Sequence, residues 1–186
     1  MKQPLIGLCL ALGLSLPALA AEVGGARLDD KVSLGGQELQ LNGAGIRTRL
    51  LFKVYVASLY LPRKSSEASA VLTQTPRRIQ LNVLRQLTAD QLVDALVEGM
   101  QANNSADELA AVKAQTDQLV ATMKAFNAVG EKDIVALDFV GGDTRISLNG
   151  EARGVIAGER FNQALTRVWL GDKPVQADLK KALLGG

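Results

Sequence analysis

The sequence contains no histidine, and its single cysteine, Cys9, lies close to its beginning. Histidine general bases, thiol nucleophiles and zinc sites built from imidazole or sulfur all need residues that the rest of the chain lacks. Disulfides are excluded there for the same reason, so the fold must be held by a hydrophobic core. We therefore expect neither a metal nor any other cofactor.

The sequence has no apolar run long enough to span a membrane. The longest, from Leu5 to Leu16, is well short of the roughly 20 residues that a spanning helix needs. It follows the basic Lys2 and precedes the small-residue site Ala18-Leu19-Ala20, which is the pattern of a secretory signal peptide. We expect residues 1–20 to be this signal peptide, residues 21–186 to form one domain, and the mature protein to be exported to the periplasm.

Neither sign of charge dominates the chain, whose formal net charge is +2. Removing Lys2 with the signal peptide leaves 20 of the 21 basic residues against 19 acidic ones, and the basic residues form no long run. This balance argues against nucleic acid as a partner, because nucleic-acid binding needs a basic patch or stripe.

The most informative stretch runs from Leu41 to Pro62. β-Branched, aromatic and aliphatic residues predict a strand from Leu50 to Leu61, and Gly43 and Gly45 before it predict a bend or bulge. Side chains alternate across a strand, so one face is predicted to be plainly hydrophobic. The other face, if no bulge intervenes, combines apolar residues with Arg47, Arg49, Lys53 and Tyr55. Two guanidiniums, an ammonium and a phenol suit an anionic head group at the mouth of an apolar cleft.

The rest of the chain alternates between strand and helix patterns. Strands are predicted at 22–28, 78–87, 134–140, 144–148 and 151–156, with a turn at Asn149-Gly150. Residues 32–41 are predicted to form a hairpin with Gly35-Gly36 as its turn. Capping boxes at Thr88 with Gln91 and at Ser105 with Glu108 predict an antiparallel helical pair, the second helix reaching Gly130. Further helices are predicted at 68–72, 159–170 and 176–184. This order predicts an α+β domain with a large antiparallel sheet covered by helices on one face.

Two segments resemble the chalcone isomerase superfamily. Gly43-Ala44-Gly45-Ile46-Arg47 followed by Phe52-Lys53-Val54-Tyr55-Val56-Ala57-Ser58-Leu59-Tyr60-Leu61 resembles that family's G-x-G-x-R, spacer, K-x-Y-A-x-G-L-Y strand. Gly154 to Gly158, Phe161 and Val168 to Val175 resemble its closing strand, helix and "LG-x-x-P-V" turn. The resemblance covers most of the chain after about Glu22 and is closest to the bacterial exported proteins and the fatty-acid-binding branch. It implies an open-faced β-sandwich with a ligand cleft between the long sheet and the helical layer.

The resemblance also implies site residues. Arg47 matches the family arginine that helps to hold and polarise the substrate in the plant enzyme and meets the carboxylate in the fatty-acid-binding branch. Lys53 and Tyr55 match its K-x-Y, and Arg49 shares the predicted face of Arg47 and could replace it. Each also has a purely structural interpretation: a solvated arginine, a lysine at a sheet edge, and a packed tyrosine.

The remaining pocket positions of the family fall near Val168 and Trp169. The chain departs from the plant enzyme, since Tyr55 occupies the position of a threonine and no tyrosine lies between Leu87 and Val93. The first hypothesis is therefore a non-catalytic exported protein that binds a fatty acid or similar amphipathic carboxylate. The second is an intramolecular lyase of chalcone isomerase type, acting on a conjugated carbonyl compound with Arg47 as its catalytic residue. The third is a periplasmic structural or assembly protein, whose partner the sequence does not identify.

Overall fold

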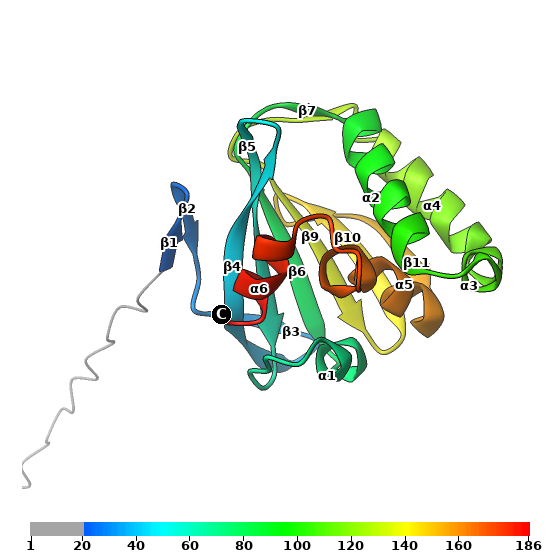
Figure 1. Cartoon of the computed structure of the whole chain (residues 1–186), viewed down its shortest axis with the longest axis horizontal. Coiled ribbons are helices and arrows are strands. Elements are labelled where there is room, and N and C mark those ends of the chain that lie inside the picture. Colours follow the sequence, from blue (N-terminus) through cyan, green and yellow to red (C-terminus); the bar gives the residue numbers. More distant parts are fainter. Residues whose placement is uncertain (1–20) are drawn as a thin grey trace, which may run out of the picture.

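A seven-stranded antiparallel sheet is the centre of the fold (Figure 1). The structure, a computed structural model, describes residues 21–186, and the predicted signal peptide at 1–20 lies outside the described residues. The strand order is β11-β10-β9-β6-β5-β4-β3. The strands are β3 (Lys31–Leu34), β4 (Gln37–Arg49), β5 (Phe52–Leu61), β6 (Arg77–Val83), β9 (Ile134–Val140), β10 (Asp143–Leu148) and β11 (Glu151–Ala157).

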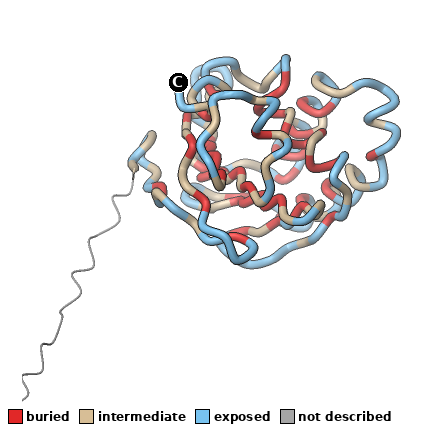
Figure 2. The backbone as a smooth tube through the Cα atoms, turned by 90° about the horizontal axis from the view of Figure 1, so that it is seen from below, coloured by how far each residue is buried: buried red, intermediate tan, exposed pale blue. Residues whose placement is uncertain are grey.

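Helices cover one face of this sheet, which makes the domain α+β with an open-faced sandwich architecture, as the sequence predicts (Figure 1). The helices are α1 (Ala68–Thr73), α2 (Ala89–Asn103), α3 (Ala106–Ala111), α4 (Lys113–Lys124), α5 (Glu159–Leu170) and α6 (Ala177–Leu183). The core lies between the two layers, where Phe139 of the sheet and Phe161 and Trp169 of α5 are almost fully buried. In Figure 2 the buried segments, coloured red, are concentrated in the interior of the domain.

Two short strand pairs lie outside the main sheet. β1 (Ala21–Val23) and β2 (Ala26–Leu28) form a small hairpin, so the prediction of one strand from 22 to 28 is wrong. Gly24 and Gly25, with φ of +58° and +87°, turn the chain between them. β7 (Leu87–Thr88) pairs with β8 (Ala128–Val129), so the residues just before α2 lie beside those that follow α4.

The predicted capping boxes are both present. The Thr88 hydroxyl accepts a hydrogen bond from the Gln91 amide at 3.1 Å, and the Gln91 side chain accepts one from the Thr88 amide at 3.1 Å. Ser105 and Glu108 make the equivalent pair at the start of α3. The helix predicted from Ser105 to Gly130 is instead two helices, because the backbone leaves helical geometry at Val112, where φ is −114° and ψ is 15°.

The stretch from Leu41 to Pro62 contains most of β4, a two-residue turn and all of β5, so the strand predicted from Leu50 begins at Phe52 instead. β4 and β5 pair up to Arg49 opposite Phe52, and Leu50 and Leu51 form a two-residue turn. The register shifts twice, which leaves Asn42 in β4 and Val54 in β5 as extra, bulged residues. The prediction of a bulge near Gly43 is confirmed, whereas the bulge in β5 changes the predicted faces of that strand.

Gly43 and Gly45 leave room for α6, which packs directly on β4. A Cβ atom at Gly45 would lie 2.8 Å from the Ala182 Cβ, and one at Gly43 would overlap the Ala182 carbonyl oxygen. The buried Asn42 side chain completes this contact by donating a 2.7 Å hydrogen bond to the Leu183 carbonyl oxygen. The G-x-G pattern is thus required for close helix packing next to Arg47.

Candidate functional site

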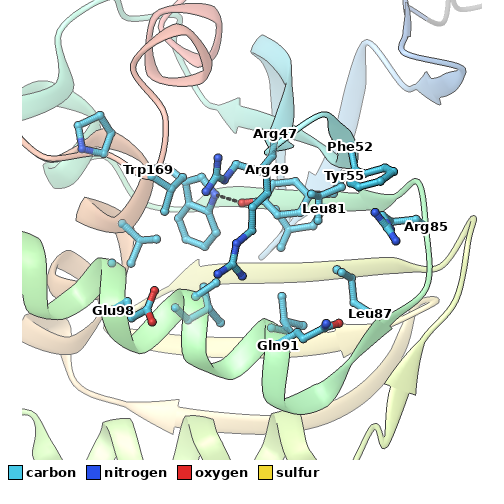
Figure 3. Close-up of a pocket in the computed structure, with 18 of the residues that line it drawn as sticks. Arg47, Arg49, Phe52, Tyr55, Leu81, Arg85, Leu87, Gln91, Glu98 and Trp169 are labelled. Atoms are coloured by element: carbon cyan, nitrogen blue, oxygen red, sulfur yellow. Dashed lines mark hydrogen bonds between the residues drawn. The ribbon is translucent and has the colours of Figure 1, made fainter.

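A cleft of about 680 Å³ opens between the ends of β4, β5 and β6 on one side and α2 and the end of α5 on the other. This volume lies within the range of roughly 300–1,000 Å³ that is usual for small-molecule sites. Its wall is mostly apolar, formed by Val54, Leu81, Leu92, Leu96, Val168 and Trp169, among others. Arg47, Arg49 and Arg85 line the cleft at or near the strand ends, and Gln91 and Glu98 line it from α2 (Figure 3).

The bulge at Val54 decides which β5 side chains reach the cleft. Arg47 lies opposite Tyr55 and Arg49 lies opposite Phe52, so these two cross-strand pairs share the face that lines the cleft. Without the bulge, Lys53 would take the place of Phe52 on that face. Lys53 is instead exposed and does not line the cleft, so its predicted position beside Tyr55 is wrong.

Arg47 is partly buried and held by a residue far along the chain. Its Nη1 donates to the Thr48 carbonyl oxygen at 2.6 Å and to Gln176 Oε1 at 3.3 Å. The Gln176 side chain also accepts from the Thr48 amide at 2.9 Å and donates to the Ile46 carbonyl oxygen at 3.2 Å. Gln176, immediately before α6, therefore fixes both the end of β4 and the guanidinium. Arg47 forms no ion pair within residues 21–186.

Tyr55 and Trp169 form the polar part of the cleft floor. The Trp169 Nε1–H donates to the Tyr55 hydroxyl oxygen at 3.2 Å, as the dashed line in Figure 3 shows. Burial raises the pKa of the Tyr55 hydroxyl, and the Trp169 hydrogen bond and the positive charge of Arg47 offset only part of that rise. The hydroxyl is thus protonated at neutral pH. Since its oxygen is the acceptor for Trp169, its own proton remains available to a ligand.

The rim of the cleft is predominantly cationic. Arg49, Arg85 and Lys173 line it together with one carboxylate, Glu98. Figure 3 shows Arg49 extending into the space between the strands and α2, and Arg85 lying over the Phe52 ring, where its guanidinium carbon is 4.5 Å from the ring centroid. An anionic group entering the cleft would therefore meet a field of favourable sign.

Of the residues proposed from the sequence, five line the cleft together: Arg47, Arg49, Tyr55, Val168 and Trp169. Sequence reasoning did not identify Gln176 or Lys173 as contributors. Lys173 lies in the turn that resembles the family's "LG-x-x-P-V" motif, which could have indicated it. Gln176 carried no comparable signal, because its role depends on the docking of α6 against β4.

The fold and cleft define an α+β domain with a ligand-sized cleft between an antiparallel sheet and a helical layer. The profile described as chalcone isomerase-like matches residues 20–185, and the chain belongs to that family. No curated protein sequence matches significantly. Among solved structures, the fold is similar to that of the Arabidopsis thaliana fatty-acid binding protein AtFAP1, with a TM-score of 0.65 and 12% sequence identity. The match covers 86% of this chain and 92% of that one.

Within residues 21–186, no helix is both long and apolar enough to cross a bilayer. The same residues contain no cluster of three or more metal-ligating side chains.

Proposed function

We propose that the protein is a non-catalytic, exported binding protein that holds a fatty acid or a similar amphipathic carboxylate in the cleft. The observation that carries the proposal is a partly buried guanidinium without a carboxylate partner among the described residues, placed beside a protonated phenol in an apolar cleft. Partly buried cations normally have an anionic partner, because removing a charge from water is costly. A ligand carboxylate would be that partner.

The head group would lie between Arg47 and Tyr55. Only Nη1 of Arg47 is used in the hydrogen bonds to Thr48 and Gln176, so its other N–H groups can donate to a carboxylate. The Tyr55 O–H supplies a further donor on the same face. Arg49 lies two residues along β4 and adds a second positive charge to the cleft. Charge-assisted hydrogen bonds of this kind are stronger than neutral ones.

The apolar part of the ligand would lie against the leucine and valine side chains of β6, α2 and α5. The family match and the similarity of the fold to a fatty-acid binding protein support this class of ligand. Export to the periplasm forms part of the proposal, and it rests on the signal-peptide pattern of residues 1–20.

The same donors suit a second function. Arg47 and the Tyr55 hydroxyl could together stabilise a developing oxyanion, which is the requirement for an intramolecular lyase acting on a conjugated carbonyl compound. The threonine of the plant enzyme is replaced by Tyr55, which makes weak turnover the expected result for such a substrate. Binding and turnover assays on one set of variants separate the two functions.

The test is native mass spectrometry of the mature protein purified from its host's exported fraction, followed by identification of any released ligand and by titration with a fluorescent fatty acid. Arg47→Ala should weaken fatty-acid binding about tenfold to a hundredfold, because a hydrogen bond to a charged group contributes about 1.5–3 kcal/mol. Arg145→Ala, which removes an exposed arginine of β10 outside the cleft, is the matched control and should bind as wild type. A cleft that is empty as isolated and takes up no added fatty acid would contradict the proposal, and chalcone cyclisation would then be assayed.

A further inference from the structure

The turn between β4 and β5 carries three consecutive exposed apolar side chains. Leu50, Leu51 and Phe52 are 87%, 93% and 57% exposed. We call residues 49–53 the hairpin apex. Among the described residues, the only other large apolar side chain with comparable exposure is Val155 of β11, at 60%. Single exposed apolar residues are common on protein surfaces, whereas a contiguous group indicates an interaction surface.

The backbone of the apex is also unusual. Leu50 has φ of +56°, and it is the first residue of a two-residue hairpin turn. Glycine or asparagine normally occupies such a position, since a leucine with positive φ is strained by contact between its Cβ and the backbone. Leu50 is therefore unfavourable in both its conformation and its exposure. Strain of this kind at an exposed site supports a functional explanation for the side chain.

Positive charges flank the apolar group. Arg49 and Lys53 lie on either side of it in the chain, and Arg85 lies over Phe52 at 4.5 Å. None of the three forms an ion pair with any residue from 21 to 186. The sequence contains no carboxylate between Glu38 and Glu67. The apex is thus an apolar turn whose nearest charges along the chain are all cationic.

We propose that the hairpin apex inserts into an anionic lipid surface. A two-residue turn is convex, so its leucines can enter the acyl boundary, while a protein partner would need a complementary groove to receive it. Arginine and lysine next to an inserted apolar segment can extend their heads to the lipid phosphates. The bulge at Val54 adds to the positive charge of this surface, because it turns the side chain of Lys53, the last residue of the apex, away from the cleft.

Insertion would place the mouth of the cleft at the lipid surface, since Leu50 and Phe52 belong to both the apex and the cleft lining. The inference does not depend on what the cleft holds. Leu51, the most exposed of the three, does not line the cleft. A substitution at Leu51 therefore tests lipid-surface binding separately from ligand binding.

The experiment is flotation of the mature protein with vesicles of phosphatidylcholine, with and without added phosphatidylglycerol. The wild type should bind the anionic vesicles, and high salt should weaken that binding because it screens surface charge. Leu51→Glu should lower the partition coefficient at least about tenfold, because it places a charge at the most deeply inserted position. For Val155→Glu, the matched control, the partition coefficient should stay within about twofold of wild type. That result would show that an added carboxylate elsewhere on the surface does not itself weaken vesicle binding.

Leu50→Gly provides an opposed pair of effects. It relieves the positive-φ strain and should raise the free energy of unfolding, while it removes an inserted side chain and should weaken vesicle binding. Equal binding of wild type and Leu51→Glu would overturn the proposal, as would a wild type that binds neither kind of vesicle. Dimerisation of the wild type in place of vesicle binding, abolished by Leu51→Glu, would overturn it too and assign the apex to a second copy of the chain.

Discussion

Gly43→Ala should destabilise the domain strongly, although alanine fits the strand backbone at this position. An added Cβ would overlap the Ala182 carbonyl oxygen and lie 2.8 Å from that of Leu183. Both contacts are with backbone, so no side-chain rotation relieves them, and α6 must move away from β4. α6 buries Leu179 and Leu183 almost completely. Losing both from the core costs about 3–6 kcal/mol, and a partial shift costs about 1–3 kcal/mol.

We therefore expect Gly43→Ala to lower the free energy of unfolding by about 2 kcal/mol or more, against a total of about 5–15 kcal/mol for a typical domain. Urea unfolding followed by far-ultraviolet circular dichroism measures this difference. Gly130→Ala is the matched control, because the φ of Gly130 is not positive and a Cβ added there would lie 3.6 Å from its nearest neighbour, a side-chain oxygen of Asp133. This substitution should change the free energy of unfolding by no more than about 0.5 kcal/mol. A Gly43→Ala protein as stable as the control would refute the close packing of α6 on β4.

Two further predictions concern the side chains around the cleft. Gln176→Ala should release Arg47 and the end of β4, and should weaken fatty-acid binding by about tenfold in the fluorescence titration. Gln115→Ala is the control, because the Gln115 side chain hydrogen-bonds only the Ala157 carbonyl oxygen, and it should leave binding unchanged. Alkaline pH should destabilise the fold, because burial raises the pKa of both Tyr55 and Tyr60 above their ordinary value near 10. The stability that the two buried, neutral phenols contribute is fully present below their unfolded pKa and is lost as pH rises through their folded pKa. Thermal melts should therefore show a falling melting temperature above about pH 10, and Tyr55→Phe should reduce that fall. An unchanged alkaline profile in that variant would contradict the assignment.

Local signals in the sequence predicted much of the fold correctly. The capping boxes join residues three positions apart, and the Asn149-Gly150 turn needs positive φ at both residues, which those residue types tolerate. Such features depend on neighbours in the chain. The order of the elements predicted the layers, and the resemblance to the family indicated a cleft between them, which Arg47 lines.

The features that the sequence did not reveal depend on contacts across the fold. The bulge at Val54 has no glycine to mark it, so alternation placed Lys53 on the wrong face. The turn at Leu50-Leu51 has no turn-forming residue, and both leucines were therefore assigned to the predicted strand from Leu50 to Leu61. Val112 interrupts the helix predicted from Ser105 to Gly130, although valine occurs within many helices. In each case the tertiary structure overrides the local preference.

The hydrogen bond between Arg47 and Gln176 joins residues 129 positions apart in the sequence. The capping boxes join residues only three positions apart and belong to single helices, whereas this contact needs nearly the whole domain. A partly folded chain would therefore carry helices but have no fixed guanidinium at the cleft. Retention of a bound carboxylate would consequently report that folding has been completed, and would give a measure of native protein that helix content alone cannot give.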